Sequence, residues 1–145
     1  MSDPDRPDRP ARRPPVGDLA TLLATLEPIL HDGVYVFASL PAALPEGLTP
    51  LGTFRESEGL TVVVTEHEAQ RHGLPVLFRA AWITLLVHSD LAAVGLTAAV
   101  ATALGDEGIS CNVVAAAYHD HLFVPVESGP AAVAALRALQ ARARG

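Results

Sequence analysis

The stretch that decides the fold is residues 82–139, WITLLVHSDLAAVGLTAAVATALGDEGISCNVVAAAYHDHLFVPVESGPAAVAALRAL. Its first six residues, Trp82 to Val87, are apolar, β-branched or aromatic, a composition typical of a buried strand. Ser89-Asp90 follow, and both residue types fit a helix cap. Apolar residues then recur at helical spacing over 91–104. The opening of the stretch therefore predicts a strand followed by a well-buried helix.

The rest of the same stretch predicts two more strands and a last helix. Residues 109–118 and 122–126 are rich in apolar and β-branched residues, and His119-Asp120 between them predicts a tight turn. Gly129-Pro130 then opens a helix, because proline is favoured in a first helical turn. Residues 82–141 thus follow the order strand, helix, strand, strand, helix.

The N-terminal half shows weaker patterns. Leucines and Ile29 recur at helical spacing over 19–30, with Pro28 expected to kink the last turn. Residues 34–38 are β-branched and aromatic and predict a strand. A loop at 40–50, rich in proline, separates this strand from the next elements.

A hairpin and a short helix complete the first half. Residues 51–56 and 60–64 flank Ser57-Glu58-Gly59, and a glycine in such a position favours a hairpin turn. Residues 66–72 are polar and predict a short helix that ends at Gly73. The same order of hairpin and helix occurs in the second half, which suggests an internal duplication.

Together these elements predict an α/β (α+β) fold with antiparallel sheets covered by helices. The second unit is one strand short of the ferredoxin-like βαββαβ order, and the first unit lacks its first crossover helix. A reciprocal arrangement, in which residues 19–38 complete the C-terminal sheet, would supply the missing strand.

The combined motifs resemble those of the ACT domain family, and in particular of small stand-alone bacterial proteins with two ACT domains and no known function. Four segments carry the resemblance: residues 82–97, 108–115, 118–126 and 56–61. The resemblance implies two ferredoxin-like, ACT-like lobes. We expect a disordered tail at 1–16, a degenerate N-terminal lobe at 17–80 and a C-terminal ACT domain at 81–145.

The resemblance also implies a ligand site. In ACT domains the turn after the first strand brings free backbone N–H groups at a helix start toward a ligand carboxylate. The matching residues here are Ser89, Asp90, Leu91, Ala92, Ala93, Val94 and Gly95. Asn112 is expected beside them. Gly95 departs from the common ACT pattern, because it stands five residues after the acidic residue instead of about two, which leaves helix packing as an alternative role.

Charged residues of the first half are candidates for the same ligand. Glu56 and Glu58 flank the hairpin turn, where they form either a solvated rim or a partner for a ligand ammonium group. Arg55 and Arg79 could hold a carboxylate by two hydrogen bonds, or form surface ion pairs. Trp82, the only tryptophan, is expected in the core or between the lobes.

The histidines and the cysteine suggest two other chemistries. His119 and His121, with His88, form a candidate metal site, although zinc needs three or four ligands. The alternative is a polar turn without metal. Cys111, the only cysteine, lies in an apolar segment and is expected to be a small core residue instead of a nucleophile.

Composition limits the remaining classes. All ten basic residues are arginine, so no lysine is present for a Schiff base or a phosphate loop. The net charge is −6, and four arginines lie in the first thirteen residues, so the folded part is more acidic still and disfavours nucleic acid. No apolar run reaches the roughly 18 residues of a membrane span. We expect a cytoplasmic protein.

The sequence therefore predicts a regulatory ACT protein, without catalytic activity or cofactor, that binds a small molecule, most simply an amino acid. A homodimer is expected, because ACT lobes commonly pair their sheet edges. The alternatives are an interaction or scaffold protein that has lost its ligand site, and a small metal-binding protein that uses His88, His119 and His121.

Overall fold

A computed structural model describes residues 19–87 and 95–145. Its helices are α1 (Leu19–Ala24), α2 (Glu66–Arg71), α3 (Leu96–Asp106) and α4 (Gly129–Arg144), with a 3-10 turn, η1 (Val126–Ser128), before α4. Its strands are β1 (Glu27–Leu30), β2 (Tyr35–Leu40), β3 (Gly52–Glu56), β4 (Gly59–Thr65), β5 (Phe78–Leu86), β6 (Asn112–Ala115) and β7 (Asp120–Pro125). The expected tail at 1–16, His88 and Ser89–Val94 lie outside the described residues.

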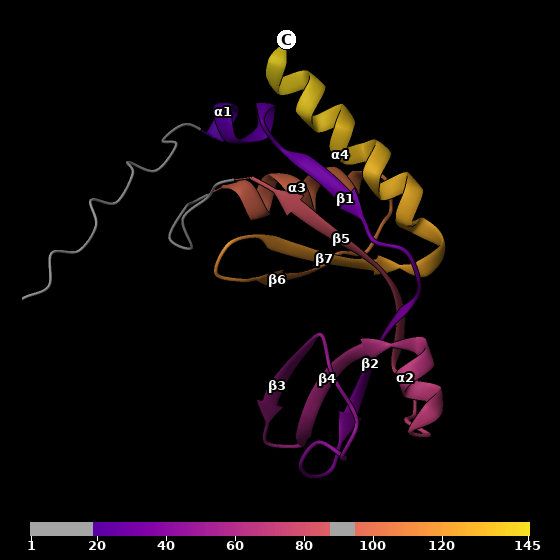
Figure 1. The fold of residues 1–145 in the computed structure, drawn as a ribbon. Coiled ribbons are helices and arrows are strands. Elements are labelled where there is room, and N and C mark those ends of the chain that lie inside the picture. Colours follow the sequence, from indigo (N-terminus) through magenta and orange to yellow (C-terminus); the bar gives the residue numbers. More distant parts are fainter. Residues whose placement is uncertain (1–18, 88–94) are drawn as a thin grey trace, which may run out of the picture.

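One long strand, β5, joins two halves of the molecule (Figure 1). Its first residues, 78–80, pair with β2, and its later residues pair with β7 and β1. Every one of these pairings is antiparallel. The resulting orders are β3-β4-β2-β5 in what we call the N-terminal lobe and β6-β7-β5-β1 in the C-terminal lobe. Both are the strand order of the ferredoxin-like fold, so the predicted fold class is confirmed.

The helix expected over 19–30 is wrong beyond Ala24. Glu27–Leu30 form β1, which pairs with residues 83–86 of β5. Pro28 has no N–H for a helical hydrogen bond, whereas an edge strand tolerates proline. This pairing supplies the strand that the C-terminal unit lacked, although only α1 and β1 do so. Residues 35–40 remain in the N-terminal sheet.

Between β1 and β2 the chain bulges by two residues. Leu30 pairs with Ile83 and Tyr35 with Ala80, so four residues lie opposite two. The His31 N–H donates to the Trp82 carbonyl at 2.9 Å, which keeps the bulge attached to β5. Such a bulge bends a strand and increases its twist, and here it marks the passage from one lobe to the other.

Three helices, α1, α3 and α4, cover one face of the C-terminal sheet (Figure 1). Strand alternation directs Ile83 and Leu85 of β5 toward the helices, where both are almost fully buried. The helices contribute Leu22, Val100, Leu104 and Leu136 to the same core. Helices α1 and α4 also bond directly, since the Arg144 Nε donates to the Ala24 carbonyl at 2.8 Å.

The N-terminal lobe has a smaller core with less cover. Its buried residues are Val36, Ala38, Leu40, Leu48, Val62, Val64 and Ala69. Among the described helices, the short α2 alone packs on this face. The Thr65 hydroxyl caps it by accepting from the Glu68 N–H. A loop at 41–51 occupies the place of the first crossover helix, whose absence the sequence predicted.

The uncovered faces of the two sheets meet through aromatic side chains. Phe37 contacts Phe123 edge-to-face with ring centroids 5.2 Å apart, and Phe78 lies against Phe37 in the same manner at 5.8 Å. Val63 and Trp82 complete this contact. Trp82 therefore lies between the lobes, one of the two places expected for it.

Element boundaries differ from the expectation in the C-terminal lobe. Strand β5 begins four residues earlier than predicted, at Phe78. Strand β6 begins only at Asn112, because the Ile109 N–H still bonds to the Leu104 carbonyl at the end of α3. The turn predicted at residues 119–120 is misplaced, since Asp120 already pairs in β7 and the chain reverses over 116–119.

Within the described ranges, no helix combines the length and the apolar character that crossing a bilayer requires.

Candidate functional site

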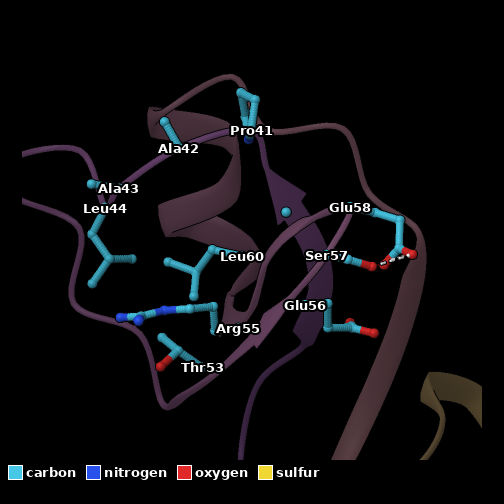
Figure 2. A pocket seen from close by; sticks show the side chains of 11 residues that line it. Pro41, Ala42, Ala43, Leu44, Thr53, Arg55, Glu56, Ser57, Glu58 and Leu60 are labelled. Atoms are coloured by element: carbon cyan, nitrogen blue, oxygen red, sulfur yellow. Dashed lines mark hydrogen bonds between the residues drawn. The ribbon is translucent and has the colours of Figure 1, made fainter.

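An open groove lies on the N-terminal lobe where the crossover helix is missing (Figure 2). Its volume is about 690 Å³. The loop at 41–44 forms one side, and the β3–β4 hairpin forms the other. The lining residues are Pro41, Ala42, Ala43, Leu44, Thr53, Arg55, Glu56, Ser57, Glu58, Gly59 and Leu60. The hairpin acids singled out from the sequence thus belong to this groove.

The groove separates its charges. Strand alternation places Arg55 on the same face of the sheet as its partner Leu60, and directs Glu56 to the other face. Figure 2 shows the Arg55 guanidinium near Leu44, with the carboxylates of Glu56 and Glu58 at the opposite, turn end. Within the part of the chain that the structure describes, Arg55 forms no ion pair.

Hydrogen bonds hold the two acids at the turn. The Ser57 hydroxyl donates to Glu58 Oε1 at 2.7 Å, and this bond, followed by one from the Glu58 backbone, lowers the pKa of the Glu58 carboxyl. The Glu56 carboxylate accepts from the Thr61 hydroxyl. Gly59 closes the turn, where a Cβ atom would lie 2.5 Å from the Leu40 carbonyl oxygen. Any larger residue would push the hairpin away from β2.

Of the other predicted ligand residues, the two that the structure describes, Gly95 and Asn112, do not lie with these acids. Gly95 precedes α3 with φ of 101°, and a Cβ there would approach the Leu19 side chain at 3.1 Å. A glycine is thus needed both for this backbone conformation and for the packing of α1. Asn112 lies on β6, where its Nδ2 donates weakly to the Phe123 carbonyl at 3.4 Å. Neither residue lines the groove.

A second pocket, of about 200 Å³, lies between the lobes. Leu51, Gly52 and Val63 line it from the N-terminal lobe. Its lining from the C-terminal lobe consists of Trp82, Val114, Ala116, His121 and Phe123. Sequence reasoning missed this pocket. Only the contact between His121 and Trp82, the single tryptophan, could have indicated it. That contact depends on the register of β5 and β7, which the sequence does not show.

Trp82 and His121 of the pocket lining belong to a polar network. The Trp82 Nε1–H donates to His121 Nδ1 at 3.1 Å, and the buried Thr84 hydroxyl lies 3.0 Å from the same nitrogen. His31 Nε2 is 2.7 Å from that hydroxyl, and the His31 ring stacks on Trp82 at 3.5 Å. Burial is the main cause that lowers the pKa of both His31 and His121. Both imidazoles are therefore favoured in the neutral form.

The described residues do not provide the ligands that the metal hypothesis requires. No group of three or more histidine, cysteine, aspartate or glutamate side chains lies close enough there to hold an ion. His119 precedes β7, so strand alternation does not align it with His121. The Nδ1 of His119 is buried without a hydrogen-bond partner.

Two other residues have the structural roles that the sequence favoured. Cys111 is half-buried against the helical core, and burial raises the pKa of its thiol to about 11. The reactive thiolate is thus scarce near neutral pH. Arg79 forms a two-bonded ion pair with Glu66, with an Nε to Oε2 distance of 2.6 Å.

Comparison with solved structures places this fold among known ones. A protein of unknown function from Vibrio cholerae, described as a possible transport protein, is 47% identical. The match covers 84% of this chain and 95% of that chain, with a TM-score of 0.78. The regulatory subunit of aspartate kinase from Thermus flavus is 12% identical, with a TM-score of 0.58 over 79% of this chain and 95% of its own. At this identity the likeness shows the fold alone.

A protein from Agrobacterium tumefaciens is also similar, with 20% identity, a TM-score of 0.63, and coverage of 79% of this chain and 89% of that chain. No curated protein matches. Two family models, each described as an ACT domain, match residues 14–81 and 78–138. The two matches follow one another along the chain and meet in β5. This chain therefore belongs to the ACT domain family and carries two ACT domains in tandem.

Proposed function

We propose that this protein is a non-catalytic regulator that binds an amino acid in the groove of its N-terminal lobe. Family membership supports a regulatory role based on a small-molecule ligand. The observation that carries the finer proposal is the arrangement of Arg55 and Glu58 at opposite ends of one open groove. An amino acid carries one group of each charge.

The chemistry of the two ends matches such a ligand. A guanidinium without an ion-pair partner can take a carboxylate by two parallel hydrogen bonds. Glu58 keeps its charge, since the hydrogen bond from Ser57 lowers the pKa of its carboxyl, and a carboxylate accepts from an ammonium group. Glu56 is a weaker candidate because its carboxylate already accepts from Thr61 on the other face of the strand.

The test is a thermal-shift screen of the full chain against the twenty amino acids. A ligand present at one hundred times its dissociation constant is expected to add about 2.7 kcal/mol to the free energy of unfolding. Arg55→Ala should weaken the binding of that ligand by about tenfold or more, because charge-assisted hydrogen bonds are the strong ones. Arg137→Ala is the matched control, since Arg137 is an exposed arginine on α4, away from the groove.

The screen also tests the other proposed place for the ligand, the turn from Ser89 to Gly95 beside Asn112. If Asp90→Ala weakens binding and Arg55→Ala does not, the ligand belongs to the C-terminal lobe. If no amino acid raises the unfolding temperature, the amino-acid proposal is wrong.

We also propose a homodimer formed through sheet edges. Strands β3 and β6 are the two ends of the strand order, and Phe54 of β3 is 72% exposed. Exposed strand edges are templates for pairing with another chain. Light scattering during size-exclusion chromatography should give twice the chain mass of 15.2 kDa. The division of the chain near residue 80, a cytoplasmic location and the absence of a nucleic-acid partner stay predictions.

A further inference from the structure

We propose that the pocket between the lobes is a second ligand site, which takes a small carboxylate with a branched or aromatic apolar body. Neither the lining nor the location is shared with the groove around Arg55. The pocket lies on the face of the C-terminal sheet that the helices do not cover. Residues from both lobes form it, so an occupant contacts both.

The walls of the pocket select an apolar body of limited size. Val63 and Phe123 form a buried floor, while Leu51 and Val114 are 44% and 46% exposed at its rim. A volume of about 200 Å³ lies below the roughly 300 Å³ at which drug-sized ligand sites begin. A ligand of fewer than about ten heavy atoms fits, and covering the two exposed rim side chains favours its binding.

The polar groups of the pocket select the head group. Trp82 Nε1–H is only a donor, so the His121 Nδ1 that it bonds is an acceptor. The proton of the neutral imidazole is therefore on Nε2. Nε2 is not among the buried atoms without a partner, and no described residue bonds it, so it is free to donate.

Among the residues that the structure describes, the lining contains no acidic side chain. A ligand ammonium group would thus lose water without gaining a partner, which is unfavourable. A carboxylate, in contrast, accepts from the Nε2–H of His121. This absence separates the pocket from the groove around Arg55 and Glu58, whose charges suit a zwitterion.

The experiment uses the only tryptophan of the chain as a reporter, because Trp82 lines the pocket. The full chain is titrated with 3-methylbutanoate while tryptophan emission is recorded, and with 3-methylbutylamine as the ligand of the same body and opposite charge. We expect a saturable change of emission with the carboxylate, and binding of the amine that is at least about tenfold weaker.

Two valine variants locate the binding. Val114→Phe should fill the pocket and weaken the binding of 3-methylbutanoate by about tenfold or more. Val76→Phe is the matched control, since Val76 is 44% exposed and outside the pocket, and it should bind as the unmodified chain does. The proposal is overturned by the absence of a saturable change, by equal binding of the amine, or by unchanged binding in Val114→Phe. Failure of the amino-acid screen leaves this test unaffected.

Discussion

The two lobes have the same strand order but differ in what covers their sheets. Three helices bury one face of the C-terminal sheet, whereas the short α2 and a loop cover the equivalent face of the N-terminal sheet. Where the N-terminal lobe lacks the crossover helix, it has an open groove with charged side chains at its ends. The comparison indicates that, in a tandem fold, one domain can provide most of the buried core while the other keeps an open groove.

The largest expected effect tests the covered lobe. Leu136→Ala removes a fully buried side chain of α4 and should lower the free energy of unfolding by about 2–5 kcal/mol. Leu48→Ala changes the 41–51 loop, which can collapse more easily around the vacancy, and should cost about 2 kcal/mol or less. Chemical denaturation measures both. Equal losses would show that the loop replaces the missing helix fully.

The next effect concerns the network between the lobes. Burial lowers the pKa of His31 and His121 from 6.5 in the fold, so the unfolded chain binds protons first as the pH falls. The stabilisation is therefore complete above about pH 6.5 and is lost as the pH falls through the lowered pKa values. We expect the free energy of unfolding to decrease between pH 7.5 and pH 5.

His121→Gln separates this effect from other groups. A glutamine oxygen can still accept from Trp82 Nε1–H, but it does not titrate. The decrease of stability between pH 7.5 and pH 5 should thus be smaller in the variant. Asp120, whose pKa is raised mainly by burial, is present in both chains, so the effect of its burial cancels in the difference. Identical pH profiles would show that His121 does not contribute.

The smallest effect is expected at the exposed ion pair between the start of β5 and α2. Arg79 and Glu66 form two hydrogen bonds, but the Arg79 side chain is about half exposed and the Glu66 side chain is partly exposed to water. Exposed ion pairs contribute little to stability. Denaturation midpoints of Arg79→Ala should stay within experimental error of the unmodified chain. A clear loss would mean that this pair fixes the N-terminal lobe on β5.

The sequence predicted the elements whose patterns are local. The β3–β4 hairpin, α2 and the last helix follow from glycine, proline and periodicity within a few residues. The helical spacing over 19–30 misled because Ile29 and Leu30 also suit a strand beside β5. Whether this segment forms a helix or a strand depends on residues more than fifty positions away, and the local pattern does not contain that information.

The candidate sites also differ in whether their sequence signals are local. Glu56 and Glu58 were found because they flank a turn that the sequence defines. The pocket between the lobes was missed, because Gly52 and Val114 become neighbours only after both lobes have folded and packed. The sequence identifies both Arg55 and Arg79 as candidates for binding a carboxylate. The structure is needed to show that Arg79 is paired with Glu66, whereas Arg55 has no ion pair among the described residues.

The pairing of β1 with β5 also constrains the order in which the two lobes can fold during synthesis. Strand β1 is made among the first residues of the fold, yet its partner segment follows only after the whole N-terminal lobe has emerged. That lobe is thus an insertion within the C-terminal one, and α4 bonds to α1 from the other side of the insertion. The N-terminal lobe can form early. The C-terminal lobe assembles only when the segments before and after the insertion have both been made.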